Sequence, residues 1–448
     1  MRYLIKNALI VNENDIISGS VLVENNIISK IFENDHDSIS LSDDTKIIDA
    51  ECNYLIPGVI DDQVHFREPG NTYKADIYTE SKAAVAGGVT SYFEMPNTNP
   101  QTTSIVELEK KFDIAKEKSL ANYSFYMGGT NENIEEIKKI DKTKVCGLKV
   151  FMGSSTGNML VDQEDALVDI FTNSPVLIAT HCEDEATIQK NNKEYKEKYG
   201  DDVPMSCHPK IRSAEACYLS TKKAVDLAKK HNARLHVLHL STEKEMELFE
   251  SDKKLEDKKI TAEVCVHHLW FDDRDYQKYG TRIKWNPAVK AESDKKALFN
   301  ALMDGKIDVV ATDHAPHTEE EKDNTYFKSP SGGPLVQHSL NAMLEFVHLG
   351  KMAITDVVQK MCHNPAILFN VKERGFIKVG YKADLVLVNI DSPWVVKKDN
   401  ILYKCGWSPF EGTLFNSKIT HTFVNGNLVY NEGVFNEDIK GERIEFDR

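Results

Sequence analysis

The sequence predicts an α/β protein in which a (β/α)₈ (TIM) barrel carries a small, β-sandwich-like domain built from both ends of the chain. Two observations support this prediction. Eight short β-rich runs, separated by segments of helical periodicity, occupy the middle of the sequence. Strand-like segments with polar turns lie before and after them. The length of 448 residues accommodates one barrel with insertions and one small domain.

The two chain ends share a strand-rich character. The first 56 residues contain three strand-like segments, with Asn25-Asn26 as a hairpin turn. Residues 375–391 and 418–434 repeat this pattern, with Asn425-Gly426 as the turn. The predicted domains are therefore a small β domain, residues 1–56 plus 375–448, and a barrel, residues 57–374.

The central region predicts the eight strands of the barrel. Residues 213–231 and 294–306 place apolar side chains at helical spacing, so we expect each strand to be followed by a crossover helix. Eight such βα units predict a closed barrel. The predicted strands are GVIDDQVHF, VTSYFEMPN, ANYSFYMGG, VCGLKVFMG, PVLIATHCE, RLHVLHLS, ITAEVCVHH and IDVVATDHA.

The predicted strands end in side chains that can bind metal ions. Because the carboxyl ends of all barrel strands meet at one face, these side chains converge although they are far apart in sequence. Imidazole and carboxylate are ligand types suited to Zn²⁺. One strand-end histidine is usually structural, but several together indicate a metal site. The candidate ligands are His65, His181, His239 and Asp313, with Lys149 as a fifth strand-end group.

Lys149 allows two interpretations, and both stay open at this stage. A protonated ammonium cannot bind a metal, but a neutral amine can react with CO₂ to form a carbamate, an anion that bridges two metal ions. Alternatively, Lys149 pairs with Asp313 or with a carboxylate of the substrate.

Seven motifs contain these residues: PGVIDDQVHFREPG (57–70), EMPNTNP (94–100), GLKVFMG (147–153), THCED (180–184), HVLHLS (236–241), EVCVHHL (263–269) and ATDHAPH (311–317). As a set and in this order, they resemble the dihydroorotases of the amidohydrolase superfamily, in particular the long, bacterial-type branch. The β-rich chain ends resemble the composite small domain of that family.

The resemblance implies a reaction and a cofactor. Dihydroorotases catalyse the reversible cyclisation of N-carbamoyl-L-aspartate to L-dihydroorotate in de novo pyrimidine biosynthesis. By resemblance, His65 and Asp313 bind one zinc ion, and His181 and His239 bind a second. A carbamylated Lys149 bridges the two ions. Asp313 is also the catalytic residue that transfers a proton to the leaving nitrogen.

The resemblance also implies how an acidic substrate is held. Arg67 suits a planar carboxylate because its guanidinium donates two parallel hydrogen bonds. The substrate-binding residues implied in this way are Arg67, Asn97, Asn286 and His317, with Ser331 and Gly332 as a backbone turn.

The first strand departs from the family pattern. That pattern is Asp-x-His-x-His, whereas this chain has Gln63 in place of the first histidine. An amide oxygen is a poorer zinc ligand than imidazole. We therefore expect one or two zinc ions per subunit, with the first ion weak, displaced, or held by His65, Asp313 and the bridge alone.

Two alternative functions stay open. Allantoinases and hydantoinases are cyclic amidases with similar metal centres, but allantoinases typically have asparagine in place of Arg67 and lack His317. Those two residues therefore favour dihydroorotase. The second alternative is a non-catalytic, dihydroorotase-like scaffold protein, which the loss of a histidine at Gln63 keeps open.

Composition limits which binding partners and which cellular location we expect. A formal charge of -15 disfavours nucleic acid and anionic membranes as partners. The expected partner, a small acidic substrate, follows from the resemblance and from Arg67 and His317. The N-terminal segment alternates polar and apolar residues, which predicts a cytoplasmic protein without a signal peptide. Eight cysteines without CxxC pairs predict reduced thiols. The resemblance implies a homodimer. Residues 153–158 and 319–333 are predicted loops at the active site.

Overall fold

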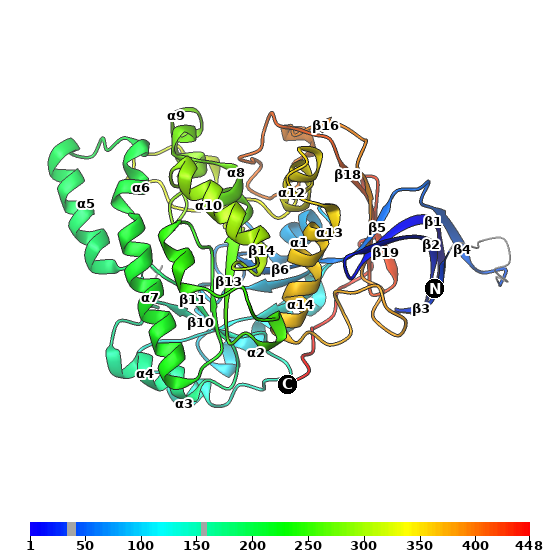
Figure 1. Cartoon of the computed structure of the whole chain (residues 1–448), viewed down its shortest axis with the longest axis horizontal. Helices are drawn as coiled ribbons and strands as arrows, with labels where there is room; N and C mark the ends of the chain where they lie inside the picture. Colours follow the sequence, from blue (N-terminus) through cyan, green and yellow to red (C-terminus); the bar gives the residue numbers. More distant parts are fainter. Residues whose placement is uncertain (34–41, 154–158) are drawn as a thin grey trace.

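The computed structural model describes residues 1–33, 42–153 and 159–448. It contains a barrel of strands and helices, beside which a twisted sheet carries the N-terminus (Figure 1). The C-terminus lies at the barrel. The predicted loop at 153–158 falls, except for Gly153, outside the described residues.

All eight predicted barrel strands are present and pair in parallel. The short strand β9 (Met127–Gly128) follows β8 after one residue and carries the pairing on to β10. A parallel bridge between Val64 and His314 joins the first strand to the end of the last, which closes the barrel. The predicted barrel is therefore confirmed. Its strands are β6 (Val59–Val64), β7 (Val89–Glu94), β8 (Asn122–Phe125), β10 (Leu148–Phe151), β11 (Ile178–His181), β12 (Leu235–Val237), β13 (Ile260–Cys265) and β14 (Val309–Ala311).

Helices follow the strands and cover the barrel (Figure 1). The helix predicted at 213–231 begins after Ser213, whose side chain accepts a hydrogen bond from the Ala216 amide, and ends at Asn232 in the left-handed conformation. The longer helices are α1 (Ile77–Ala86), α2 (Ile105–Lys118), α4 (Glu164–Asn173), α5 (Glu185–Tyr199), α7 (Ala214–His231), α10 (Glu292–Met303) and α12 (Ser339–His348). The shorter ones are α3 (Ile134–Ile137), α6 (His208–Ile211), α8 (Val266–Trp270), α9 (Tyr276–Tyr279), α11 (Glu319–Lys322), α13 (Ile354–Val358) and α14 (Asn364–Phe369).

The two chain ends form one nine-stranded sheet, in which β5 from the N-terminal segment pairs antiparallel with β15 from the C-terminal segment. Both predicted hairpin turns are present, and positive φ angles at Asn25, Asn425 and Gly426 form them. The sheet strands are β1 (Arg2–Asn12), β2 (Asp15–Glu24), β3 (Ile27–Glu33), β4 (Lys46–Asp49), β5 (Tyr54–Pro57), β15 (Leu385–Asn389), β18 (Lys418–Val424), β19 (Asn427–Asn431) and β20 (Val434–Phe435). Strands β16 (Trp394–Val395) and β17 (Leu414–Phe415) form a separate pair.

The last residues of the chain leave this sheet and pack against the barrel. Ile444 and Phe446 are buried in one apolar cluster with Phe93, Tyr126 and Phe369. The C-terminal segment thus contributes to both parts of the fold. The predicted domain boundaries at 56/57 and 374/375 stay a prediction.

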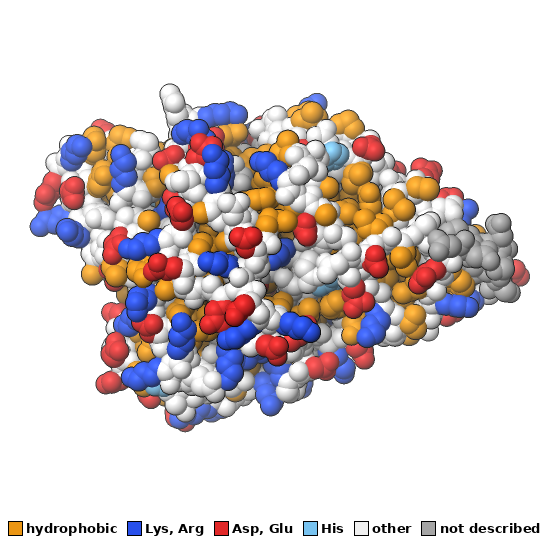
Figure 2. All heavy atoms as spheres, in the orientation of Figure 1, with side chains coloured by type: hydrophobic (Ala, Val, Ile, Leu, Met, Phe, Trp, Pro, Cys, Tyr) orange, Lys and Arg blue, Asp and Glu red, His pale blue; other side chains and the backbone are white. Residues whose placement is uncertain are grey.

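Charged side chains of both signs are interspersed on the face of the molecule shown in Figure 2. The eight cysteines are free thiols. Within the described ranges, no helix is both long and apolar enough to cross a membrane.

Candidate active site

A cavity of about 230 Å³ opens at the carboxyl ends of the barrel strands. All eleven residues that the sequence singled out for metal or substrate binding line it, as do Gln63, Phe151, Ala315 and Pro330. The residues come from six strand ends, from the segment before α10 (Asn286) and from the loop after α11, so closure of the barrel is what brings most of them together. The eleven are His65, Arg67, Asn97, Lys149, His181, His239, Asn286, Asp313, His317, Ser331 and Gly332.

His65 and Asp313 face each other with a geometry that suits a cation. Nδ1 of His65 lies 2.8 Å from Oδ1 of Asn97, an acceptor, so this nitrogen carries the proton. The lone pair on Nε2 then points at Oδ1 of Asp313, 3.1 Å away. Burial lowers the pKa of His65 against the pull of Asp313, which keeps the ring neutral. Two electron-rich atoms in contact fit a bound metal ion.

His181 and His239 repeat this arrangement on the opposite side of the cavity. Nε2 of His181 donates to Glu183 at 3.0 Å, which leaves its Nδ1 lone pair facing Nε2 of His239 at 3.0 Å. Burial lowers the pKa of His239 well below its usual value, and His181 adds to this effect. Burial raises the pKa of Glu183, but the nearby Arg212 and the hydrogen bond from His181 outweigh it and lower that pKa to about 2.

Lys149 lines the same cavity and is almost completely buried. Burial lowers the pKa of its amine to about 8, although Asp313 and Glu263 attract the charged form. Nζ lies 4.8 Å from the ring centre of Phe151. A substantial share of the amine is therefore neutral near pH 8, which is the form that reacts with CO₂.

Gln63 turns its amide nitrogen toward the cavity. Nε2 donates to Oδ1 of Asp313 at 3.2 Å, and Oε1 lies 3.7 Å from Sγ of Cys265. The oxygen, which is the only atom of this amide that can bind a metal, points away from His65 and Asp313. Gln63 thus acts as a hydrogen-bond donor to a candidate ligand.

One end of the cavity is cationic. Arg67 and Lys74 both contact His317, through its Nε2 and Nδ1 respectively, at 3.1 Å each. Glu321 lies 3.1 Å from Lys74. Nε2 of His317 also lies 3.1 Å from the Ser331 carbonyl oxygen. Two cations beside one carboxylate prepare this end for an anionic group.

The backbone turn at Ser331 and Gly332 is held in place from below. Lys322 has no exposed surface, and its ammonium donates to the carbonyls of Pro330 (2.8 Å) and Gly332 (2.7 Å). Oγ of Ser331 donates to Oδ1 of Asn286 at 3.0 Å. Lys322 and Asn286 thus position the turn that was predicted to bind substrate.

Three of the cavity residues have strained backbones. Arg67, His239 and Asp313 adopt φ angles of 67°, 40° and 48°, in the left-handed region that side chains other than glycine rarely occupy. Such strain collects at functional sites, where the surrounding structure maintains it.

Comparison with known proteins agrees with this geometry. The model of the amidohydrolase family matches residues 54–429. The dihydroorotase of Methanosarcina acetivorans is 34% identical over 98% of this chain and 95% of its own length. The dihydroorotase of Pyrococcus furiosus is 32% identical over 96% and 92%. The chain belongs to the amidohydrolase family, among the dihydroorotases.

Solved structures of other amidohydrolases have the same fold. An L-hydantoinase (dihydropyrimidinase) from Arthrobacter aurescens matches with a TM-score of 0.91 at 27% identity, over 97% of both chains. A dihydropyrimidinase from Brevibacillus agri matches with a TM-score of 0.89 at 24% identity, over the full length of both chains. The second likeness shows the fold alone.

Sequence reasoning missed several residues of this amidohydrolase site. Glu183 follows His181 by two positions within THCED, and this spacing was the available signal for a carboxylate that orients a ligand. Lys74 lies in a loop and Lys322 at the end of α11, and both contact the site only through tertiary folding. No local pattern marks them.

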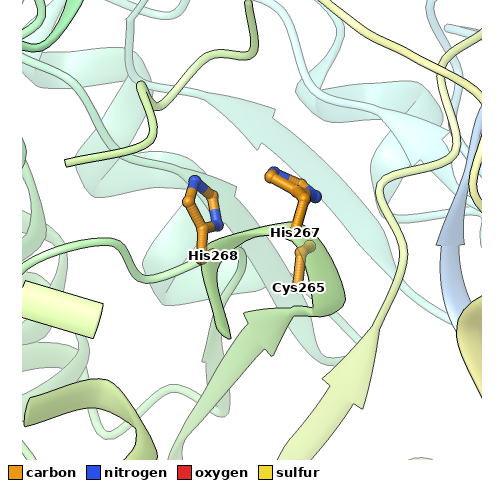
Figure 3. Close-up of side chains that lie close together, drawn as sticks. All are labelled: Cys265, His267 and His268. Carbon is orange, nitrogen blue, oxygen red and sulfur yellow. The ribbon is translucent and has the colours of Figure 1, made fainter. Parts of the chain in front are cut away.

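Two histidines of the seventh strand end, left unassigned as ligands, lie beside the cavity without lining it. His267 and His268 are buried on the turn into α8, close to Cys265 (Figure 3). His267 stacks on Trp285 with ring centres 4.2 Å apart, and Nε2 of His268 hydrogen-bonds the Pro287 carbonyl at 3.1 Å. These contacts support the interpretation that both pack around the site.

Proposed function

We propose that this protein is a dihydroorotase, which catalyses the reversible cyclisation of N-carbamoyl-L-aspartate to L-dihydroorotate. The observation that carries the proposal is the layout of the cavity. Four metal-ligand candidates and Lys149 line the same cavity as Arg67, whose guanidinium contacts His317. This layout suits a cyclic amide that carries a carboxylate.

The proposed cofactor is zinc. One ion would be held by His65 and Asp313, the other by His181 and His239, with a carbamate on Lys149 as the bridge. When bound, the metal ions would polarise the ring carbonyl and lower the pKa of a water molecule. The contacts of His65 with Asp313 and of His181 with His239, and the lowered pKa of Lys149, support this assignment.

The other steps, proton transfer and substrate binding, are assigned to side chains of the cavity. Asp313 lies at the metal-ligand side, where its carboxylate is positioned to take a proton and transfer it to the ring nitrogen. Arg67 and His317 would hold the substrate carboxylate by charge and hydrogen bonds. Asn97, Asn286 and the turn at 331–332 would orient the ring.

Gln63 affects how tightly the first zinc ion would be held. Because its amide nitrogen points at Asp313, it supplies no lone pair to the first position. We therefore propose that the second ion binds more tightly than the first. A cytoplasmic location and a homodimer are further parts of this proposal, the latter by resemblance to the family.

The test is turnover of L-dihydroorotate, with allantoin and a simple hydantoin as comparators, on protein whose zinc content is measured and varied. We expect selective, zinc-dependent hydrolysis of dihydroorotate, abolished in Asp313→Ala. Preference for hydantoin would favour the hydantoinase alternative, which the likeness to L-hydantoinase supports. Failure to turn over any of the three, with zinc bound and the fold intact, would favour a non-catalytic scaffold.

A matched variant separates substrate recognition from chemistry. Arg67→Gln removes the positive charge that faces the substrate carboxylate. We expect the KM for dihydroorotate to rise, while residual turnover of hydantoin, which has no carboxylate, stays unchanged. An equal loss for both substrates would contradict the role assigned to Arg67.

A further inference from the structure

Three further ligand-type side chains converge inside the barrel, outside the cavity described above. Asp62 on β6, His236 on β12 and Glu263 on β13 each have no exposed surface. Nε2 of His236 lies 3.2 Å from Oδ2 of Asp62 and 3.8 Å from Oε2 of Glu263. One ligand atom from each residue lies within 4.8 Å of the other two. These residues come from three strands, so the fold and not local sequence assembles them.

The tautomer of His236 follows from its other ring nitrogen. Oγ1 of Thr261 donates its hydrogen to the Leu235 carbonyl at 3.2 Å, and it therefore accepts from Nδ1 of His236 at 2.8 Å. The neutral ring then presents the Nε2 lone pair to the two carboxylates. A histidine that ligates a metal is usually fixed in this way, by donating its second N–H to a neighbour.

The carboxylates lack other partners. Apart from the contacts with His236, neither oxygen of Asp62 nor Oε2 of Glu263 has a hydrogen-bond partner among the described residues. With the ring neutral and both carboxylates ionised, this buried group has a charge of -2. A divalent cation would neutralise the two negative charges of the carboxylates.

We propose that Asp62, His236 and Glu263 bind a third divalent metal ion of the zinc type, beneath the catalytic centre. Metal–ligand distances of about 2.0–2.2 Å place tetrahedral ligands about 3.3–3.6 Å apart. The observed separations of 3.2 and 3.8 Å lie close to this range. Two carboxylates and one imidazole form a donor set that zinc accepts.

The ion would have a structural role with a link to catalysis. It connects β6, β12 and β13 below the points where these strands reach the cavity. Oε1 of Glu263 accepts a hydrogen bond from the backbone N–H of His239 at 3.0 Å. The ion therefore fixes the carboxylate that holds the backbone of a candidate catalytic ligand.

A second group of ligand-type residues lies nearby and is the competing candidate for a metal site. Cys265, His267 and His268 also lie within 4.8 Å of one another, on a single strand-to-helix turn (Figure 3). This group contains no carboxylate, and burial raises the pKa of the Cys265 thiol well above its usual value. It therefore attracts a cation less strongly than the group formed by Asp62, His236 and Glu263.

The deciding experiment is an anomalous-difference map at the zinc edge, from crystals of the zinc-loaded protein. We expect a peak between Asp62, His236 and Glu263, separate from any peaks at the cavity ligands. Occupied cavity positions with no peak at the three residues would overturn the proposal. A peak beside Cys265 in place of the expected one would also overturn it.

Metal analysis of two variants provides a second measurement in solution. Asp62→Asn keeps the size of the side chain and removes its charge, so the bound zinc should fall by about one equivalent per chain. Cys265→Ala, the matched control, should retain the full content. Equal zinc in Asp62→Asn and the unaltered protein would contradict the proposal. If Asp62→Asn does not fold, the map of the unaltered protein decides alone.

Discussion

Three histidines of the barrel are oriented in the same way, by a hydrogen bond from one ring nitrogen. One ring nitrogen donates to a fixed acceptor, which is Asn97 for His65, Glu183 for His181 and Thr261 for His236. The other nitrogen then presents a lone pair to a carboxylate or a second imidazole. The hydrogen-bond partners thus indicate which nitrogen of each ring faces a candidate metal position.

Gln63 stands where the pattern Asp-x-His-x-His, implied by the family resemblance, has a histidine. Gln63→His would place an imidazole beside Asp313 and complete the family's ligand pattern. We expect the first zinc ion to be retained more tightly, as measured by the zinc left after dialysis against increasing chelator. Gln63→Leu, which removes the amide without adding a ligand, serves as the control. Equal zinc retention in both variants would show that position 63 does not reach the first metal.

Gly332 is required by its backbone and by its surroundings. Its φ is +127°, and a Cβ would lie 2.4 Å from the Ala315 carbonyl oxygen. Gly332→Ala should displace the substrate-binding turn and lower kcat/KM about a hundredfold. Gly350→Ala is the matched control, because Gly350 also has a positive φ of +64° but has no atom within 4 Å of its Cβ position. Similar losses in both variants would refute the steric argument.

At the scale of elements, the segment around α11 behaves as part of the rigid site. The amines of Lys284 and Lys322 are buried, and both bind backbone carbonyls of residues 326–332. Burial lowers the pKa of Lys284 to about 8. The predicted loop over the substrate at 319–333 is thus anchored from inside by two side chains.

Lys322→Met tests this anchoring. The variant leaves the carbonyls of Pro330 and Gly332 without a donor, and each unsatisfied group costs about 1–3 kcal/mol. We expect KM to rise more than kcat falls, together with faster amide hydrogen exchange in residues 326–332. Lys328→Met, which changes an exposed lysine of the same loop, should have neither effect. Unchanged exchange in Lys322→Met would contradict the role of the buried amine.

At the scale of the whole molecule, the C-terminal tail joins the two parts of the fold. The chain passes from the nine-stranded sheet to the barrel, where Ile444 and Phe446 enter the apolar cluster around Phe93. The side chain of Arg448 donates to the carbonyls of Phe369, Val145 and Cys146. The tail therefore contributes to the stability of the barrel.

Phe446→Ala should destabilise the protein as a whole. The side chain is 2% exposed, and truncation of a buried phenylalanine costs about 3–5 kcal/mol. Thermal or denaturant unfolding measures this loss. Phe327→Ala, at a phenylalanine that is 39% exposed, should cost far less. Equal unfolding free energies for the two variants would show that the tail does not support the core.

Local sequence determined the elements of this protein and most of the candidate ligands. Helical and alternating periodicity are set by neighbours in the chain, so the eight barrel strands, the helix at 214–231 and both Asn-containing turns could be predicted. The cavity residues could be predicted because they occupy strand ends, which the barrel topology brings together.

Only the tertiary structure decided how these side chains are oriented and which distant residues support them. The direction of the Gln63 amide, the anchoring of the 331–332 turn by Lys322, and the meeting of Asp62, His236 and Glu263 all depend on contacts between residues far apart in sequence. Such contacts leave no periodic signal, because they arise from the packing of complete elements. For the same reason, the path of the C-terminal tail from the sheet to the barrel could not be predicted from its sequence.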